Sequence, residues 1–525
     1  MLWSLSLVIG CDSGSELVKG PSAADTGSTV ELPADSGEDT AEHGTDCESF
    51  GRSDVAAHLS LETDAWVHDE ARTDGNPLKG FLTSYLWAEP ANDMPDSMEF
   101  LYLPMSALWG ADGETFDAGL EPLLEAAAAR AHHAVLRVYL DYPTKPSGVP
   151  DYLAETVGCS PYADHGGGCS PDYEHPELKA AILGLIDSLG ERYDGDPRLG
   201  FVQVGLLGFW GEWHTWPHTE LFPSEAMQAE VLDAFVGAFS ITHLMVRRPA
   251  VHAVDLRIGF HDDSFAYSTL GDIDWFFWPG LIAAGAAERW QQVPIGGELR
   301  PELQSQVFDD AYSVGTYSQD FNACAETTHA SFLLNYWAYS GDGVGYVGEE
   351  RVRAERAARD MGYAFALTGA SLHLSALDEG HVDGTVRLEI AATGVAPFYY
   401  SLEPTLVDQG TGEVLASADP LLSLLPGDSH TAEFIIRNAP SRVFEGPLML
   451  ELRSPMLLHG QRIQLPTITP WTLSEGLTSV AWTLGCEGPD GRLSVGDLST
   501  VDDRACECRC DVDGTLRGPS GELCF

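Results

Sequence analysis

Basic residues are scarce in this chain of 525 residues. It has 28 lysines and arginines against 80 aspartates and glutamates, which gives a formal net charge of −52 at pH 7. A surface of that sign repels the phosphate backbone of nucleic acids, so we expect no nucleic acid partner. The same charge keeps a protein in solution and does not by itself identify what it binds.

Several signatures of familiar functional classes are also missing. The sequence has no glycine-rich phosphate loop, no nucleophilic serine elbow and no zincin motif in a suitable context. We therefore expect no cofactor. Beyond the first residues, no segment is long and apolar enough to span a membrane.

The amino-terminal residues MLWSLSLVIG are apolar and lead directly into Cys11. The sequence Val8-Ile9-Gly10-Cys11 resembles the lipobox of bacterial lipoproteins, in which the cysteine is lipidated after cleavage, although the usual Lys/Arg n-region is missing. Residues 12–58 are rich in Ser, Gly, Thr, Asp and Glu, which predicts a disordered acidic tether after the signal at 1–11. We expect an exported protein whose only membrane anchor is a lipid on Cys11, with secretion as the alternative.

Nine further cysteines follow Cys11. Cys159 and Cys169 bracket a polar loop, so they are candidates for a local disulfide in an oxidising compartment. The CECRC cluster, flanked by Cys486 and Cys524, predicts a small cysteine-rich tail over residues 471–525. No paired CxxC spacing supports a metal site in that tail.

Strand-like and helix-like segments alternate between residues 59 and 368, as in a parallel sheet wrapped by helices. After a lead-in strand at 59–67, the predicted strands are 80–87, 99–104, 134–142, 201–207, 243–247, 257–261, 293–297 and 331–334. The predicted helices are 119–131, 176–193, 224–239, 280–291, 301–313 and 349–362, with Ser224 as the N-cap of the third. Eight strand-then-helix units in about 290 residues predict a (β/α)8, or TIM, barrel.

The pattern changes near residue 369. Short alternating runs such as GTVRLEIAATG and HTAEFIIRN are separated by Gly, Pro, Asn and Asp, which predicts a small antiparallel β-sandwich over residues 369–470. The predicted fold is α/β: a barrel, a sandwich and the cysteine-rich tail.

The barrel prediction also indicates where a site would lie. The carboxyl ends of the strands of such a barrel meet at one mouth, so residues that follow different strands lie close together. Carboxylates, cations and aromatic rings at that mouth suit a polyhydroxylated sugar ring. The candidate binding residues are Asp141, Tyr142, Trp210, Trp213, His214, Arg247, His261, Asp262, Asp263, Arg300, Asn335, Tyr336 and Trp337.

Glu212 and Glu298, which follow the fourth and seventh strands, are the candidate catalytic pair. Glu212 lies among tryptophans, so we expect burial to raise its pKa, as an acid that protonates a leaving sugar oxygen requires. We expect Arg137 and Arg247 to pair with the mouth carboxylates and to keep Glu298 ionised, with a purely structural ion pair as the alternative. The structural alternatives are that the tryptophans pack in the core, that Glu212 caps a helix, and that Glu298 is a helix N-terminal acid.

The barrel region, residues 80–362, resembles clan A glycoside hydrolases, which carry the acid/base on strand four and the nucleophile on strand seven. The resemblance implies that Glu212 is the acid/base and Glu298 the nucleophile of a retaining mechanism. That clan usually has Asn before the strand-four Glu, whereas this chain has Gly211. The contact to the sugar 2-hydroxyl would then fall to His214, Asn335 or Asp141.

A second resemblance covers most of the chain. The stretches NPLKGF, LRVYLDYP, GLLGFWGEWHT and GFHDDSF are similar to those of an uncharacterised family of bacterial exported proteins, and they imply a barrel followed by a sandwich. No activity follows from this resemblance.

Three functions fit these observations. The first is a retaining glycoside hydrolase that acts on an oligo- or polysaccharide. The second is a non-catalytic glycan-binding surface lipoprotein. The third is a metal-dependent hydrolase that uses His261, Asp262 and Asp263, although substrate hydrogen bonding or loop structure also explains those residues.

Overall fold

The structure is a computed structural model. It describes residues 56–60, 67–87, 94–339, 345–378, 381–408, 410–422, 424–440, 443 and 448–468, together with short strands between 478 and 517. The predicted signal with Cys11 and the tether up to residue 55 lie outside the described residues, as does most of the cysteine-rich tail. Within the described ranges, no helix has the length and apolar character to cross a membrane.

Eight parallel strands form a closed barrel, which confirms the predicted fold. Around the barrel they are β3 (Gly80–Ser84), β4 (Met98–Pro104), β7 (His133–Tyr139), β10 (Leu199–Gln203), β11 (His243–Val246), β12 (Ile258–Phe265), β13 (Ile295–Leu299) and β14 (Ala330–Leu334). Each neighbouring pair is parallel, and β14 pairs with β3 to close the ring.

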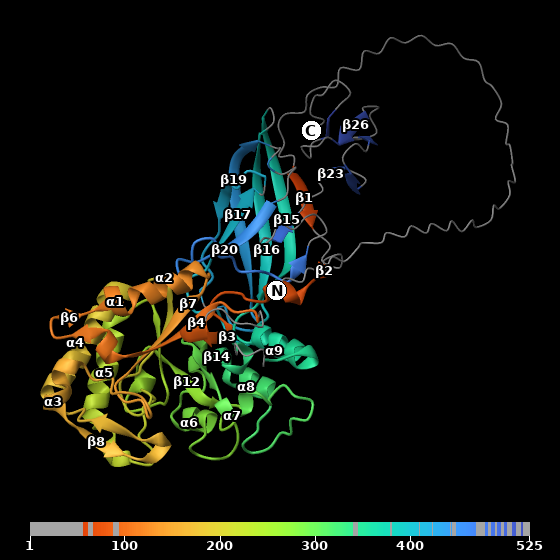
Figure 1. Cartoon of the computed structure of the whole chain (residues 1–525). Coiled ribbons are helices and arrows are strands. Elements are labelled where there is room, and N and C mark those ends of the chain that lie inside the picture. The colour runs from red at the N-terminus through yellow and green to blue at the C-terminus, as the bar shows by residue number, and fades with distance from the viewer. Residues whose placement is uncertain are drawn as a thin grey trace, which may run out of the picture. The chain divides into compact units, whose positions relative to one another are not determined.

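Helices lie around the outside of these strands (Figure 1). They are α1 (Phe116–Gly119), α2 (Glu121–Ala129), α3 (Ala154–Val157), α4 (Pro176–Tyr193), α5 (Glu225–Ala238), α6 (Phe277–Ala283), α7 (Pro301–Gln304), α8 (Phe321–Thr328) and α9 (Gly348–Asp360). The hydroxyl of Ser224 accepts a hydrogen bond of 3.2 Å from the backbone N–H of Met227, which confirms the predicted N-cap of α5.

Alternate residues of each strand pack in different places. Leu136, Val202, Leu244 and Phe260 are buried in a core shared with α2, α4 and α5. Their neighbours Val135, Phe201 and Met245 belong to a second core. A period of two along a strand produces this division, because successive side chains point to opposite faces.

Two antiparallel sheets follow the barrel. One has the order β1-β15-β16-β19 and the other β18-β17-β20-β22. The strands are β1 (Ala56–Ser60), β15 (Phe365–Asp378), β16 (His381–Ala392), β17 (Glu403–Asp408), β18 (Val414–Ser417), β19 (Ser429–Pro440), β20 (Leu448–Arg453) and β22 (Thr478–Val480). In β16, buried Val386, Leu388 and Ile390 alternate with more exposed polar residues. This is the pattern from which the sandwich was predicted.

The sandwich packs directly on the barrel. Its residues Phe365, Leu388 and Phe434 share one core with the barrel residues Phe201 and Phe332. Hydrogen bonds cross the same boundary: His243 Nε2 lies 2.9 Å from the carbonyl oxygen of Tyr399, and the hydroxyl of Tyr400 donates to the carbonyl of Gly200.

Short two- and three-stranded ribbons complete the described secondary structure. They are β2 (Val67–His68) with β21 (Thr467–Ile468), β5 (Trp109–Gly110) with β6 (Gly113–Glu114), β8 (Cys159–Tyr162) with β9 (Gly168–Pro171), and β23 (Gly485–Gly488) with β24 (Gly491–Ser494). The last ribbon contains β25 (Leu498–Thr500), β26 (Glu507–Cys510) and β27 (Leu516–Arg517).

Several predicted boundaries are wrong. The helix predicted at 301–313 is only α7, and α8 was not predicted, although the side chain of Asp320 caps it with a 2.8 Å bond from Ala323 N–H. The strand predicted at 201–207 ends at Gln203. The described ends of the lead-in strand predicted at 59–67 belong to β1 and β2, and residues 61–66 lie outside the described residues.

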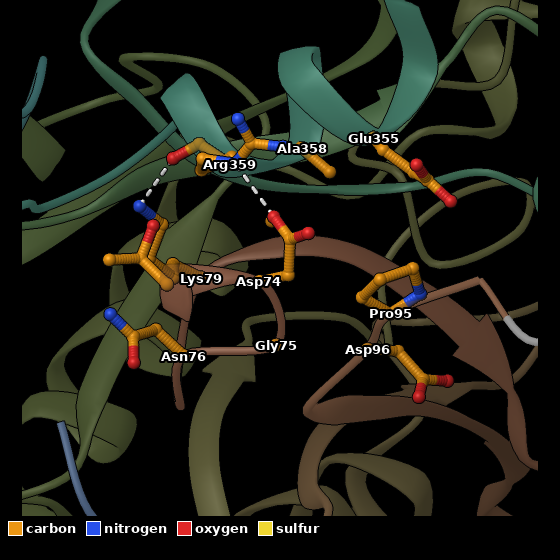
Figure 2. Close-up of a pocket in the computed structure, with 11 residues that line it drawn as sticks. Asp74, Gly75, Asn76, Lys79, Pro95, Asp96, Glu355, Ala358 and Arg359 are labelled. Atoms are coloured by element: carbon orange, nitrogen blue, oxygen red, sulfur yellow. Dashed lines mark hydrogen bonds and ion pairs between the residues drawn. The ribbon is translucent and has the colours of Figure 1, made fainter. Parts of the chain in front are cut away.

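The amino-terminal end of the barrel contains a buried lysine. Lys79 Nζ donates hydrogen bonds of 2.6 Å to the carbonyls of Arg359 and Tyr363. Figure 2 shows Lys79 with the neighbouring Arg359, whose Nε donates to Asp74 Oδ1 at 2.7 Å. Burial lowers the pKa of Lys79 to about 7, because the charged form loses its hydration.

Candidate functional site

The barrel interior changes from apolar to polar within one step of two residues. Val135 is followed two residues later by Arg137 on β7, Phe201 by Gln203 on β10, and Met245 by Arg247 after β11. Residues two apart on a strand share a face. The polar members therefore form a layer above the apolar one, toward the carboxyl ends of the strands.

Arg137 is the centre of this polar layer. Its Nη2 donates hydrogen bonds of 2.9 Å to both carboxylate oxygens of Asp263, its Nη1 donates to Glu212 Oε1 at 3.3 Å, and its Nε donates to Gln203 Oε1 at 2.7 Å. His261 Nδ1 lies 2.9 Å from Asp263 Oδ1. A charged group so deeply buried needs partners of this number and geometry.

Arg247 joins the same two carboxylates from the other side. Its Nη1 donates to Glu212 Oε2 and, at 3.0 Å, to Asp263 Oδ2. The predicted pairing of Arg137 and Arg247 with mouth carboxylates is thus confirmed. Two arginines and two carboxylates from four parts of the chain form one network, called the mouth network below.

The pKa of Glu212 does not shift as predicted. Burial alone would raise it, but the Arg247 guanidinium, with help from His214 and Arg137, lowers it below the usual value for a glutamate. His214 Nε2 lies 3.5 Å from Glu212 Oε2. The prediction of a raised pKa was wrong because the tryptophans around Glu212 were considered without the arginines.

Glu298 shows the opposite behaviour. Burial raises its pKa well above the usual value, and the negative charges of Asp263 and Glu212 add to that effect. Within the described part of the chain, no hydrogen bond or ion pair reaches its carboxyl group. The expectation that the arginines keep Glu298 ionised was therefore wrong, because both arginines bind Glu212 and Asp263 instead.

The segment from Val204 to Trp216 follows an unusual path that brings Glu212 to the network. Leu206, Trp210 and Trp213 have positive φ angles of 67°, 55° and 57°. Such angles are rare for residues with a side chain and are retained where the surrounding structure enforces them. Here backbone hydrogen bonds do so: Trp210 N–H donates to the carbonyl of Asp141 at 2.8 Å, and Trp213 N–H to that of Leu207 at 3.0 Å.

Gly211, directly before Glu212, also has a positive φ of 65°. A Cβ atom at this position would lie 3.0 Å from the carbonyl oxygen of Val138 and 3.2 Å from the nitrogen of Leu206. The backbone therefore favours glycine where the clan A resemblance implies asparagine.

The three predicted residues around Glu212 occupy different environments. Trp213 is 3% exposed, lies in the hydrophobic core and donates its indole N–H to the carbonyl of Val204 at 2.7 Å. Trp210 and His214 are only partly buried, with ring centroids 5.9 Å apart. Of these three, Trp210 and His214 are the ones that solvent reaches.

Asp141 lies beside a disulfide-linked hairpin. Its Oδ1 accepts a 2.7 Å hydrogen bond from the hydroxyl of Tyr162 in β8, and burial raises its pKa. The predicted disulfide between Cys159 and Cys169 is confirmed, and it joins β8 to β9. The hairpin thus positions Tyr162, which stacks on Phe209 with centroids 4.3 Å apart.

Asp262 points away from the mouth network because it alternates with His261 and Asp263 along β12. Its Oδ2 accepts from the Thr269 hydroxyl at 2.7 Å and its Oδ1 from Ser264 N–H at 2.9 Å. Burial raises the pKa of Asp262 to about 6. Asp262 therefore bonds the segment that follows β12, whereas Asp263 belongs to the mouth network.

The remaining predicted residues follow β13 and β14. Arg300 pairs with Glu302 and lies 4.9 Å from the ring centroid of Tyr267. Asn335 is fully buried, and its Oδ1 accepts from Ala338 N–H at 3.2 Å. Tyr336 and Trp337 are partly buried. The negative charge of Glu298 contributes, after burial, to the raised pKa of Tyr336, which places that ring near the carboxyl pair.

The sequence prediction missed a cluster of tyrosines beside the mouth network. Tyr102, Tyr139 and Tyr142 have ring centroids 5.2 to 5.4 Å apart. Only Tyr142 was predicted. The other two follow from strand parity, because Tyr102 is two residues after Phe100 on β4 and Tyr139 two after Arg137 on β7.

A metal centre finds no support in these positions. Across the described ranges, no group of three or more His, Cys, Asp or Glu side chains is arranged to hold a metal ion. His261 and Asp263 bond each other and Arg137, while Asp262 bonds Thr269.

Fold and site together define an α/β protein with a (β/α)8 barrel, a packed β-sandwich and a buried arginine–carboxylate network at the barrel mouth. No protein-family model and no curated protein sequence matches the chain.

Among solved structures, similar chains include glycoside hydrolases. A β-glucanase from Saccharophagus degradans is 9% identical with a TM-score of 0.32, covering 59% of this chain and 94% of its own. The tri-modular endo-β-1,4-glucanase B from Bacillus halodurans is 10% identical with a TM-score of 0.34, covering 79% and 99%. An α-amylase from Geobacillus thermoleovorans, solved with acarbose, is 10% identical with a TM-score of 0.23, covering 62% and 82%. At these values the likenesses carry no argument about this chain's function.

Proposed function

We propose that this protein cleaves a glycosidic bond of an oligo- or polysaccharide at the barrel mouth, with Glu298 as the acid and Glu212 as the ionised carboxylate. One feature carries the proposal: two carboxyl groups at the barrel mouth, Glu212 and Glu298, have pKa values shifted in opposite directions by burial and by the arginines. Glycoside hydrolysis needs one protonated and one ionised carboxyl group, and environments that push two pKa values apart supply them.

The residues divide the chemistry as follows. Burial raises the pKa of Glu298 well above its usual value, no hydrogen bond among the described residues reaches its carboxyl group, and it protonates the leaving oxygen. Glu212 is held ionised by Arg247 and stabilises the positive charge that develops at the anomeric carbon. This assignment reverses the one that the clan A resemblance implied. Attack by Glu212 itself gives retention of configuration, and attack by a water gives inversion.

A sugar ligand is supported by the distribution of exposed aromatic rings. In the described part of the chain, the large aromatic side chains classed as exposed are Tyr152, Trp216, Trp275 and Tyr317. All four lie in segments that follow barrel strands, namely β7, β10, β12 and β13. Flat apolar faces at the rim of a polar mouth suit sugar rings, which have one apolar face and a polar edge.

The test is hydrolysis of a broad polysaccharide panel, followed by reducing-end release and by NMR of the product anomer. Glu298→Gln should lower the rate by at least about 100-fold, because general acid catalysis contributes on that order. Glu212→Gln should also abolish turnover. Glu230→Gln, which replaces an exposed glutamate paired with Lys179 on α4, is the matched control and should keep full activity. Full activity in Glu298→Gln would refute the assignment.

The second candidate is a glycan-binding protein without turnover. It is favoured by the engagement of both Glu212 oxygens, Oε1 by Arg137 and Oε2 by Arg247. A carboxylate so engaged is a weakened nucleophile. Glycan binding that is retained in wild-type protein, with no reducing ends released from any member of the panel, would select this candidate.

We also propose export with a lipid on Cys11 as the anchor. The Cys159–Cys169 disulfide supports it, because disulfides persist in oxidising compartments. Metabolic labelling with a radioactive fatty acid should mark the wild-type chain and leave Cys11→Ser unlabelled. Equal labelling of both would refute the proposal.

A further inference from the structure

Two cationic side chains near the mouth network have no acidic partner. Within the described residues, no ion pair joins Lys145 or Arg248 to a carboxylate, and neither side chain bonds a backbone carbonyl. The chain has 80 acidic and 28 basic residues, so an arginine or lysine side chain that points away from the mouth has many acidic side chains with which to pair. Most described arginines do have such partners, as Arg198, Arg353 and Arg359 illustrate.

Lys145 lies on the tyrosine cluster. Its Nζ is 3.8 Å from the ring centroid of Tyr142 and 5.9 Å from those of Tyr102 and Tyr139. The guanidinium of Arg137 lies 5.4 Å from the centroid of the same Tyr102 ring. Lys145 is therefore adjacent to the mouth network, and its exposed ammonium group remains open to solvent.

Arg248 follows β11 directly after Arg247. It is exposed, and its positive charge adds, after burial and the Arg247 charge, to the lowering of the His214 pKa, which the contact with Glu212 opposes. The charges of Glu212 and Asp262 oppose the lowering of its pKa by burial and by Arg247. Arg248 thus places an exposed guanidinium at the carboxyl end of β11, next in the chain to the arginine that binds Glu212.

The charge of the mouth differs from that of the whole chain. The mouth network and its neighbourhood contain four cations, Arg137, Arg247, Arg248 and Lys145, against the two network carboxylates, whereas the chain as a whole has a net charge of −52. Arg137 and Arg247 are neutralised by Glu212 and Asp263. The two remaining cations are available to a ligand.

We infer that the substrate of the proposed reaction is an acidic glycan, whose carboxylate or sulfate groups are bound at the barrel mouth by Lys145 and Arg248. This inference rests on the proposed function and specifies its substrate class. A guanidinium and an ammonium group each form charge-assisted hydrogen bonds with such an anion. The tyrosine rings under Lys145 provide an apolar face for the sugar ring that carries the anion.

The experiment compares acidic polysaccharides with neutral counterparts, using the full chain. Polygalacturonate is paired with its methyl-esterified form, which has the same sugars and linkages without the charge, and κ-carrageenan is paired with its desulfated form. The first pair tests a carboxylate and the second a sulfate. Binding is measured by calorimetry at two salt concentrations, and cleavage by reducing-end release.

The test variants are Lys145→Met and Arg248→Met. The matched controls are Lys179→Met and Arg356→Met, which remove one positive charge each from exposed pairs on α4 and α9. At least one acidic polysaccharide should bind better than its neutral counterpart. Each test variant should weaken that binding roughly 10-fold, whereas the controls should stay within about 2-fold.

Two results would overturn the inference, and they differ in what they say of the proposed function. If neutral counterparts are bound and cleaved as well as acidic ones, and Lys145→Met and Arg248→Met have no effect, the substrate class is wrong while the glycosidase proposal stands. If no member of either pair, nor of the broad panel, is bound or cleaved, both fail.

Discussion

Arg137 and Asp263 form a buried ion pair in which one guanidinium nitrogen, Nη2, lies 2.9 Å from both carboxylate oxygens. Their side chains are only 2% and 1% exposed. Breaking such a pair from one side leaves a charge buried without compensation, whereas removing an exposed pair changes little. Removing one partner of this pair should therefore destabilise the fold more than removing one partner of an exposed pair of the same types.

Arg137→Met should lower the free energy of unfolding by about 3 to 5 kcal/mol, measured by urea denaturation. Arg387→Met is the matched control, because Arg387 pairs with Glu433 on the sandwich surface, where both side chains are 40 to 50% exposed. Its effect should stay below about 1 kcal/mol. Equal effects of the two substitutions would show that the mouth network does not stabilise the fold.

Glu298 and Glu212 should respond differently to the same substitution at pH 7. Glu298→Gln resembles the neutral form that burial already favours, so the free energy of unfolding should change by less than about 1 kcal/mol. Glu212→Gln removes the charge that Arg247 and Arg137 bind, and should destabilise the fold by about 2 kcal/mol or more. Thermal and urea unfolding measure both. A more destabilising Glu298→Gln would contradict the opposite pKa shifts.

The lowered pKa of Lys79 predicts a specific pH dependence of the free energy of unfolding. Its pKa is about 7 in the folded protein and about 10.4 in the unfolded chain. Between these values the unfolded chain binds more protons, so the Lys79 contribution to the unfolding free energy rises with pH and is lowest below pH 7. Removing the amino group with Lys79→Met should abolish this contribution, which is of the order of 4 kcal/mol across that range.

The measurement is the difference between variant and wild-type unfolding free energies from pH 7 to 10. A difference is needed because His132, whose pKa the Asp96 and Glu99 contacts raise to about 9 against the effect of burial, has the opposite slope between about pH 6.5 and 9. Lys179→Met, at an exposed ion pair, should leave the slope unchanged. A pH-independent difference between Lys79→Met and wild type would disprove the shift.

Replacing Gly211 and Gly237 by alanine should change the free energy of unfolding in opposite directions. Gly211 has a φ of 65° and a Cβ there would meet the Val138 carbonyl at 3.0 Å, so Gly211→Ala should destabilise by about 1 to 3 kcal/mol. Gly237 lies in α5, where an added Cβ meets no atom within 4 Å, so Gly237→Ala should stabilise by about 0.5 to 1 kcal/mol. Denaturation midpoints of both variants decide this. Stabilisation by Gly211→Ala would mean that the loop before Glu212 is not constrained as described.

The parallel barrel could be predicted from sequence because each strand is an apolar run followed either by a segment with helical periodicity or by a turn. β7 and β14 show this clearly, since all their residues are buried. α8 was missed because the one helix predicted between β13 and β14 was assigned to residues 301–313, whereas the segment from Pro301 holds only the short α7 and the second helix begins after Asp320. The strand predicted at 201–207 was too long, since Val204 to Leu207 are as apolar as a strand but leave it through a positive φ at Leu206.

Following each strand to its carboxyl end placed Glu212, Arg247, Asp263 and Glu298 in one candidate set, and the structure joins the first three by hydrogen bonds. The directions of the Glu212 and Glu298 pKa shifts were predicted wrongly. Which carboxylate binds the arginines depends on inward parity along β7 and β12, where Arg137 and Asp263 share the interior with His261. Sequence spacing alone does not show which of two glutamates that follow different strands lies next to the arginines. The directions of the two pKa shifts could therefore not be predicted from it.

The contacts of Tyr399 and Tyr400 with the barrel have a consequence for any attempt to divide the chain. The Tyr400 hydroxyl donates to the carbonyl of Gly200 in β10, and the Tyr399 hydroxyl donates to the carbonyl of Trp290. The Tyr399 carbonyl accepts from His243 Nε2 at the start of β11, and Phe365 shares a core with Phe201. A barrel expressed without residues beyond 364 would expose that apolar surface to water and leave the Gly200 carbonyl without its donor. Barrel and sandwich should therefore unfold in a single calorimetric transition, and the sandwich cannot be exchanged like an independent appended domain.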